Sequence, residues 1–234
     1  MKKLFYLLSL LLAALLVSCS SAENENKEAD DVKEPSTSDR INPANGHAYV
    51  DLGLSVKWAT CNVGANDPKE YGDYFAWGET KPKDYYDWDT YKWCNGNYMN
   101  FTKYCTVSVD GKVDNKTVLD LTDDAAHANW GGAWRMPTLK EQQELLDNCT
   151  WTWTKVNGVN GYTVTGPNGN SIFLPAAGFR YDSGLDGAGS NGNYWSSSLS
   201  THDSSAYYLD FYSYYVDWGS AYLFSGQSVR PVLP

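Results

Sequence analysis

The stretch AYYLDFYSYYVDW, residues 206–218, decides the fold of this chain because its alternating pattern predicts a β-hairpin with two unlike faces. Successive side chains of a strand point to opposite faces, and a turn near Ser213 and Tyr214 would return the chain along the first strand. One face is expected to be buried and contains Tyr207, Leu209, Phe211, Val216 and Trp218. The other is expected to face water and contains Tyr208, Asp210, Tyr212, Tyr215 and Asp217.

The water-facing side of this hairpin has the composition of a binding surface. Tyr offers a large contact area at a low cost in side-chain entropy, while Asp and Ser adapt their hydrogen bonds, as in the binding loops of antibodies. The alternative is that Tyr is present only as a good strand former, with Ser and Asp filling turns. The candidate ligand-binding residues are Tyr208, Asp210, Tyr212, Tyr215, Asp217, Ser220, Tyr222 and Phe224. The residues expected to support them from below are Trp195, Leu209, Phe211, Val216 and Trp218.

The rest of the domain predicts an α+β fold with many short, mainly antiparallel strands. Residues 49–60 predict a strand pair, and residues 67–99 predict loops that carry many Tyr and Trp. Further strands are predicted at residues 151–156, 162–165, 171–176, 194–198, 206–212, 215–218 and 227–232. Two helices that precede so many short strands favour the α+β class.

The two helices are predicted from their end signals. The first covers residues 122–129, with Thr122 as N-cap and Gly131 as the stop. The second begins at the capping box Thr138-Leu139-Lys140-Glu141, in which the Thr and Glu side chains each accept a hydrogen bond from the other residue's backbone.

Four motifs, in order along the chain, connect it with a known family. They are Trp134-Arg135-Met136-Pro137-Thr138, Leu174-Pro175-Ala176-Ala177-Gly178-Phe179-Arg180, Gly192-Asn193-Tyr194-Trp195-Ser196-Ser197 and Ser228-Val229-Arg230-Pro231-Val232. Together they resemble the Fibrobacter succinogenes major paralogous domain, over roughly residues 46–232. The resemblance implies a C-type lectin-like fold, in the broad group that includes formylglycine-generating enzymes and the variable proteins of diversity-generating retroelements.

The resemblance to retroelement variable proteins bears on the water-facing side of the hairpin. Those systems randomise adenines in AAY codons, so the encoded residues change among types such as Asn, Tyr, Ser, Asp, Gly, Ala, Leu and Phe. Between Ser196 and Gly226 the chain has no Lys, Glu, Gln, Met or Arg. The resemblance thus implies a diversified surface, with a reverse transcriptase gene and a near-copy of the region encoding residues 178–232 beside the gene. A related family member without a retroelement is the alternative.

The first 45 residues predict export and a lipid anchor. Lys2 and Lys3 precede an apolar run, and Leu16-Val17-Ser18-Cys19 resembles the lipobox of lipoprotein signal peptides. Residues 1–18 are therefore expected to be a signal peptide, with lipidation at Cys19, because the apolar run is short for a membrane span. Residues 19–45 predict a flexible acidic tether, and residues 46–234 predict one domain.

The destination predicted from this leader is the outer membrane. The acidic segment 23–28 partly resembles the signals that route Bacteroidales lipoproteins to the outer face of that membrane, which would place the domain on the cell surface. The periplasmic face of the same membrane and an ordinary secreted protein are the alternatives.

Composition narrows the range of partners. The formal net charge is −10 and no basic cluster occurs, so nucleic acid is not expected as a partner. Four cysteines, Cys61, Cys94, Cys105 and Cys149, would allow up to two disulfides in an exported chain. Cys94 with Cys105 is the favoured pair, while Cys61 is equally compatible with a buried thiol.

No pattern predicts a catalytic residue, a metal site or a cofactor. His47, His127 and His202 lie far apart, and the chain lacks a G-x-S-x-G elbow and a CxxC pair. The cysteine pair of formylglycine-generating enzymes and the Glu-Pro-Asn and Trp-Asn-Asp triplets of calcium-dependent lectins are also missing. Residues 182–193 partly match a calcium loop, but Gly184 replaces an oxygen ligand and Asn193 replaces the usual Glu.

The acidic aromatic segment 84–89, DYYDWD, would suit a sugar or a cation, although a turn whose aromatic rings fold back onto the core is the favoured interpretation.

The sequence as a whole predicts a non-enzymatic surface lipoprotein that binds a protein or glycan ligand through the hairpin. The alternatives are a structural subunit of a surface assembly and a glycan-active enzyme. Arg230 is expected to be a buried ion-pair partner that locks the final strand.

Overall fold

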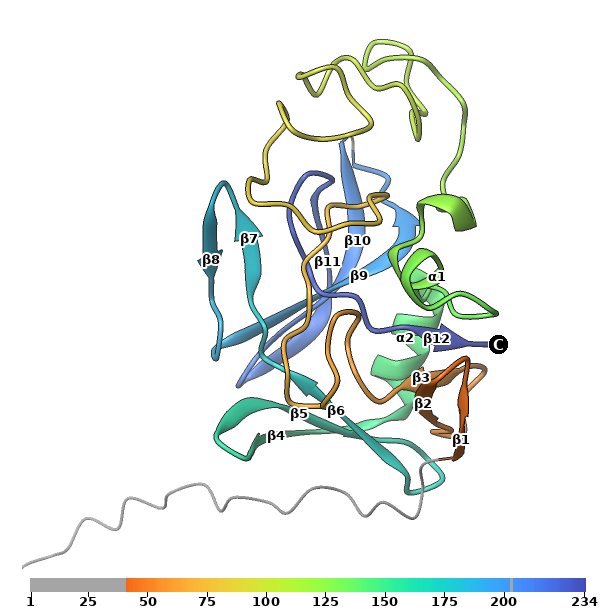
Figure 1. Ribbon diagram of the computed structural model, residues 1–234, viewed down its shortest axis with the longest axis vertical. Helices are drawn as coiled ribbons and strands as arrows, with labels where there is room; N and C mark the ends of the chain where they lie inside the picture. Colours follow the sequence, from red (N-terminus) through yellow and green to blue (C-terminus); the bar gives the residue numbers. More distant parts are fainter. Residues whose placement is uncertain (1–40, 203) are drawn as a thin grey trace, which may run out of the picture.

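The computed structural model describes residues 41–202 and 204–234 and has an α+β fold, as predicted, with short antiparallel strands and two α-helices (Figure 1). The strands are β1 (Ile41–Ala44), β2 (His47–Val50), β3 (Lys57–Ala59), β4 (Thr150–Val156), β5 (Val159–Thr165), β6 (Ser171–Pro175), β7 (Phe179–Tyr181), β8 (Gly184–Asp186), β9 (Asn191–Leu199), β10 (Ser205–Tyr212), β11 (Tyr215–Tyr222) and β12 (Val232–Leu233). The helices are α1 (Ala125–Trp130), which follows a 3-10 turn at Leu121–Asp123, and α2 (Leu139–Asn148).

One sheet joins the two ends of the domain. Its order is β1-β2-β3-β12, with Val50 and Val232 both paired to Trp58, so the end of the chain lies beside its first strands (Figure 1). The strand pair predicted for residues 49–60 is confirmed. Strand β1 lies inside the stretch predicted as tether, so the sheet begins at Ile41 and not at residue 46.

The leader itself falls outside the described residues. The signal peptide predicted for residues 1–18, the lipidation at Cys19 and the tether up to residue 40 belong to this part of the chain. Among residues 41–202 and 204–234, no helix is both long enough and apolar enough to cross a membrane.

Residues 60–120, between β3 and the 3-10 turn, form the loop-rich half of the molecule, and their yellow and yellow-green part lies at the top of Figure 1. These loops are held together by aromatic side chains and not by the backbone hydrogen bonds of paired strands. The Tyr86 hydroxyl donates to the Tyr74 carbonyl at 2.6 Å, and the Tyr91 hydroxyl donates to the Trp77 carbonyl at 2.8 Å. Because buried carbonyls need partners, these bonds let loops without regular structure be packed inside the domain.

The two helices have the expected end signals, with one correction. The capping box is present, since Glu141 N–H donates to Thr138 Oγ1 and Thr138 N–H donates to Glu141 Oε2. In the first helix the N-cap is Asp124 and not Thr122, because residues 121–123 form the 3-10 turn. The stop at Gly131 is confirmed, with φ +66° and its N–H bonded to the His127 carbonyl.

Two further expectations are corrected. The predicted disulfide is absent, because Cys94 Sγ donates to the Trp88 carbonyl and Cys105 Sγ donates to the Val107 carbonyl. In place of the strand predicted for residues 227–232, only the short strand β12 forms. The residues before it make isolated bridges with distant parts of the chain, as Ser228 does with Tyr194.

Candidate functional site: the β10–β11 hairpin

The hairpin forms with the predicted alternation and lies in a three-stranded sheet of order β11-β10-β9 in the centre of Figure 1. Its register pairs Asp210 with Asp217 and Tyr212 with Tyr215, so these side chains share one face. We call this surface the tyrosine face; its members are Tyr208, Asp210, Tyr212, Tyr215 and Asp217. On β9, Trp195 and Asn193 lie opposite Tyr208 and Asp210 and extend the same face.

The opposite side of β10 is anchored in the core, as predicted. Leu209 and Phe211 are buried, and the Phe211 ring meets Tyr162 at 5.3 Å and Tyr194 at 5.8 Å between ring centroids. On β9, Trp195 is fully buried, but it lies on the same side of the sheet as Tyr208 and not below the face as predicted; its Nε1 donates to the Phe75 carbonyl at 2.8 Å. These contacts fix β10 in position.

The buried side of β11 was predicted less well. Trp218 is 44% exposed and Val216 is only half-buried, because β11 is the last strand of its sheet and helix α2 contacts the sheet without enclosing these side chains. By register, Ser220 and Tyr222 lie on the side of Trp218, away from the tyrosine face, although both are exposed.

The prediction of one ligand-binding residue is wrong. Phe224 is 2% exposed and packs against Trp88 at 4.8 Å, so it belongs to the core and not to a ligand surface. The chain leaves the sheet after Tyr222, and alternation along a strand stops predicting exposure at that point.

The centre of the tyrosine face holds two carboxylates directly opposite each other. Like charges in such cross-strand pairs destabilise a sheet. Asp210 is half-buried, and burial, with a smaller contribution from Asp217, raises the pKa of its carboxyl to about 6. No Lys or Arg occurs between Tyr181 and Val229 to neutralise the pair from within this segment. The face therefore has an acidic centre without a basic partner of its own.

A row of amides leads from the interior to Asp210. Asn191 Nδ2 donates to Asn193 Oδ1 at 2.8 Å, and Asn193 Nδ2 donates to Asp210 Oδ1 at 3.2 Å. Both asparagines are buried. Sequence reasoning missed them, although each lies two residues from the next, which places both side chains on one face of a strand.

The tyrosines differ in how far they are available to a ligand. Tyr208 is half-buried against Trp195 at 6.1 Å, and burial raises the pKa of its hydroxyl. Tyr212 and Tyr215 are exposed, and Tyr212 stacks on Tyr214 at 6.0 Å. Tyr214, in the turn, is 87% exposed and was not among the candidate residues, because strand alternation does not describe a turn. The hairpin thus ends in a group of three exposed rings.

Asp210→Asn is expected to stabilise the protein at neutral pH. A raised pKa in the folded state means that ionising Asp210 costs stability, so wild-type stability falls as the pH rises from about 4, the unfolded value, to about 6 and then levels off. The Asn side chain of the variant still offers an oxygen to Asn193, and it does not ionise, so the stability of the variant does not fall with pH. At pH 7 the free energy of unfolding of the variant should therefore exceed that of wild type by about 1 kcal/mol, after allowance for solvent screening.

Urea unfolding between pH 4 and pH 8 would measure this difference. Asp147→Asn, at an exposed carboxylate of α2, is the matched control and should leave the pH profile unchanged. Equal profiles for wild type and Asp210→Asn would show that Asp210 ionises without cost.

The acidic aromatic segment 84–89 folds back onto the core, as favoured. Tyr86 is buried, and Trp88 contacts Phe101 at 5.8 Å as well as Phe224. The segment that partly matches a calcium loop contains the turn and the second strand of the β7–β8 hairpin, which sequence reasoning missed, and the backbone of Asp182 pairs with that of Tyr86. Across residues 41–202 and 204–234, no group of three His, Cys, Asp or Glu side chains is placed to hold a metal ion.

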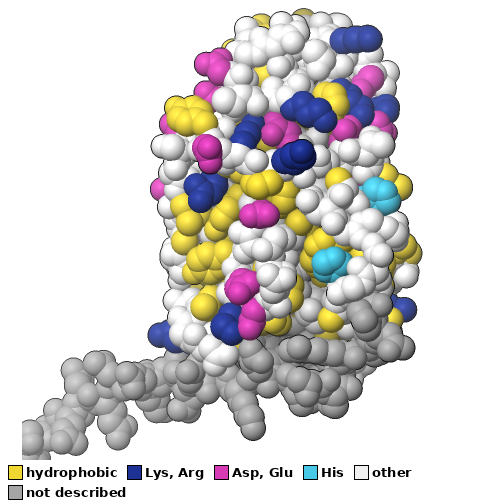
Figure 2. Space-filling model, viewed as in Figure 1, with side chains coloured by type: hydrophobic (Ala, Val, Ile, Leu, Met, Phe, Trp, Pro, Cys, Tyr) yellow, Lys and Arg dark blue, Asp and Glu magenta, His cyan; other side chains and the backbone are white. Residues whose placement is uncertain are grey.

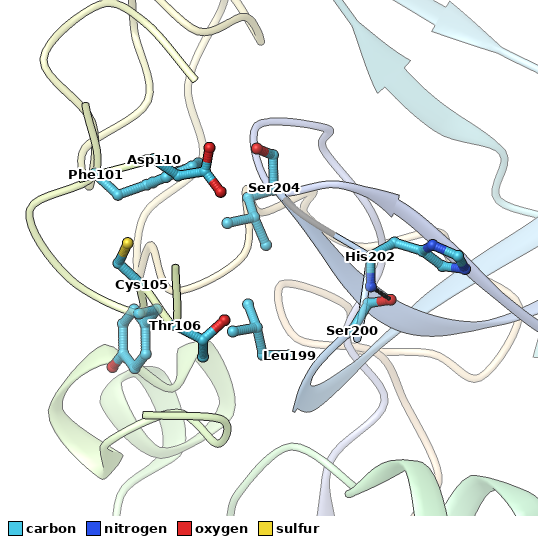
Figure 3. A pocket seen from close by; sticks show the side chains of 10 residues that line it. Phe101, Cys105, Thr106, Asp110, Leu199, Ser200, His202 and Ser204 are labelled. Carbon is cyan, nitrogen blue, oxygen red and sulfur yellow. Dashed lines mark hydrogen bonds between the residues drawn. The ribbon is translucent and has the colours of Figure 1, made fainter. Parts of the chain in front are cut away.

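A small hollow between the loop-rich half and the β9–β10 turn brings together residue types used in cysteine catalysis (Figure 3). Cys105, Asp110 and His202 line it, yet Figure 3 shows the His202 ring pointing away from the others. Its volume of about 20 Å³ holds roughly one water molecule. A nucleophile and its base must lie within hydrogen-bond reach, which this arrangement does not provide.

The other two histidines lie at separate places in the structure and contact different residues. His47 stacks on Trp130 at 3.8 Å, and burial lowers its pKa, while His127 Nδ1 lies 3.2 Å from the Trp134 carbonyl oxygen. On the face of the molecule in Figure 2, Lys and Arg are interspersed with Asp and Glu, so this view shows no broad basic patch.

Comparison of the chain with protein-family models, with curated proteins and with solved structures gives no match.

Proposed function

We propose that this chain is a non-enzymatic, lipid-anchored protein of the bacterial cell surface that binds a protein ligand through the tyrosine face of its β10–β11 hairpin. The observation that carries the proposal is the Asp210–Asp217 pair. Two carboxylates held opposite each other, one of them half-buried, cost stability and have no basic neighbour on their own strands. Such local conflicts are expected where a surface is built for a ligand.

A protein ligand suits this surface because the exposed rings stand at the end of a hairpin. Tyr212, Tyr214 and Tyr215 bring large, stiff side chains to the turn, while Phe211 holds the strands from below. Rigid tyrosines around an acidic centre are the kind of contact set that binds protein surfaces with little loss of entropy.

We also propose that the domain is C-type lectin-like. Support comes from the burial of residues within the four motifs that carry the resemblance. Trp134, Ala176, Trp195 and Arg230 each come from a different motif and are all 1% exposed or less. The motifs therefore contribute residues to the core of this domain, as expected if they define its fold.

The structural-subunit alternative has one observation in its favour. Strand β11 is eight residues long, is the last strand of its sheet in the described chain, and carries no Lys or Pro that would discourage pairing with another chain. In that alternative a neighbouring chain would cover β11 permanently. The tyrosine face is rich in Tyr and Asp, however, and a permanent interface is expected to be more apolar.

Site-specific photo-cross-linking tests the proposal in the full chain on living cells. A photoreactive amino acid in place of Tyr214 should give discrete adducts with another protein, because the ring is 87% exposed in the turn, next to Tyr212 and Tyr215 of the proposed contact. The same probe in place of Val109, which is 70% exposed in the loop-rich half, is the matched control and should give none. Adding the double substitution Tyr212→Ala and Tyr215→Ala should abolish the Tyr214 adduct.

The outcomes separate the alternatives. Adducts that competing soluble chain diminishes indicate reversible binding, as proposed. Adducts with a protein that copurifies at fixed stoichiometry, and that competitor does not displace, indicate a structural subunit. The same adducts from both probe positions, or adducts insensitive to the double substitution, would contradict a role for the tyrosine face.

A further inference from the structure

A groove separates helix α2 from strand β11, on the other side of this strand from most of the tyrosine face. Its volume is about 410 Å³, within the range of sites that hold small ligands. Trp151 and Trp218 provide apolar walls, and Gln143 and Asp147 of α2 provide the polar groups. Asp217 also borders the groove, but by register its side chain belongs to the tyrosine face.

The two tryptophans are held in place before any ligand arrives. Trp151 Nε1 donates to the Leu145 carbonyl at 3.3 Å, and its ring meets Tyr162 at 5.5 Å between centroids. Trp218 packs edge-on against Tyr207 at 5.4 Å and still leaves 44% of its surface exposed. An indole that stays exposed in a groove lacks the hydrophobic stabilisation that full burial would give, and a ligand that covers it can supply that stabilisation. Its fixed position lowers the entropy cost of binding.

The polar groups are available for new hydrogen bonds. Gln143 and Asp147 are four residues apart on α2 and therefore lie on the same side of the helix. The side chain of neither residue makes a hydrogen bond with another residue in the described part of the chain. No Lys or Arg lines the groove.

From this arrangement we infer that the groove binds a neutral sugar unit of a glycan, with its ring against Trp218. One face of a sugar ring is a patch of C–H groups, which packs on an indole, and its rim carries hydroxyl groups, which donate to carboxylates. Trp218 stands on the wall formed by β11 and Asp147 on the wall formed by α2, so a ring packed on the indole can donate a hydroxyl hydrogen to this carboxylate. The inferred site goes beyond the proposed function, because it uses a different surface and a different class of ligand.

Binding of a panel of neutral oligosaccharides to the full chain tests the inference. The panel holds hexamers of glucose, mannose, galactose, xylose and N-acetylglucosamine, and binding is measured by calorimetry and by tryptophan fluorescence. At least one is expected to bind, and Trp218→Ala is expected to weaken that binding about tenfold, which is about 1.4 kcal/mol. Asp147→Asn should weaken it as well, because it replaces the carboxylate on the helix.

Controls distinguish this site from the tyrosine face. Tyr85→Ala removes an aromatic side chain with the same exposed fraction, 44%, elsewhere on the surface, and should leave sugar binding unchanged. Tyr212→Ala should also leave it unchanged, although it weakens the protein contact proposed above. Circular dichroism establishes that Trp218→Ala remains folded, and Trp218→Phe should restore part of the affinity.

Three results would overturn the inference. The first is the absence of binding to every member of the panel at millimolar concentration. The second is binding of tetramethylammonium in place of any sugar, with the same dependence on Trp218, since this would identify a site for cations. The third is sugar binding that Trp218→Ala and Tyr85→Ala leave equally strong.

Discussion

Replacement of Arg230 by Met is expected to lower the free energy of unfolding by about 4 kcal/mol, a large part of the roughly 5–15 kcal/mol that stabilises an ordinary domain. Arg230 is 1% exposed, and its guanidinium donates to Asn62 Oδ1 at 2.9 Å and to three backbone carbonyls. The carbonyls belong to Ala59, Thr60 and Phe173, at 3.0, 2.8 and 3.0 Å. Met would fill the space but would leave these acceptors buried without a donor, which is the costly outcome for a polar group.

This arrangement corrects the expected ion pair. Arg230 is buried and locks the end of the chain as predicted, but its bonded partners are neutral oxygens, and burial lowers the pKa of the guanidinium. One side chain thereby ties the end of β3 to β6 and to the final segment of the chain. Arg230→Lys should cost nearly as much as Arg230→Met, because a single ammonium cannot reach acceptors arranged around a planar fork.

Chemical denaturation of both variants would measure the effect. Arg180→Met is the matched control, because Arg180 is half-buried over the Tyr74 ring at 5.3 Å, and this change should cost about 1 kcal/mol or less. An Arg230→Met protein within about 1 kcal/mol of wild type would show that water or rearranged backbone satisfies the four acceptors.

Phe211→Ala is expected to destabilise the protein by about 4 kcal/mol, the second large effect. Phe211 is fully buried under the tyrosine face, where its ring contacts Tyr162, Tyr194 and Trp153. Gly192 lies so close that an added Cβ would be 2.1 Å from Phe211 Cζ, so the ring occupies a site without spare space. Truncation would therefore leave a cavity whose rigid aromatic walls cannot collapse.

The same change should disturb the hairpin before the whole domain unfolds. Hydrogen exchange of the β10 and β11 amides in Phe211→Ala should increase more than that of the β4–β5 amides, since the lost ring supports β10 directly. Tyr215→Ala, at an exposed position paired with Tyr212, is the control and should change stability by less than about 0.5 kcal/mol. Equal losses from Phe211→Ala and Tyr215→Ala would contradict the assignment of a buried and an exposed side to this hairpin.

The sequence by itself determined the elements whose signals are local. The alternation in residues 206–212 correctly placed Leu209 and Phe211 in the core, because a strand has only two faces and one of them was apolar. The capping box fixed the start of α2, since both of its partners lie within one helical turn. The clustering of Tyr and Trp in residues 67–99 correctly indicated loops.

The tertiary structure alone decided what depends on residues far apart in the chain. Trp218 is exposed because β11 happens to end its sheet, and Phe224 is buried because the chain turns inward onto Trp88 after the strand. The partners of Arg230 and the asparagines behind Asp210 likewise come from other segments. Short-range alternation says which side a residue faces, whereas burial depends on what packs against that side, and only the folded chain supplies that neighbour.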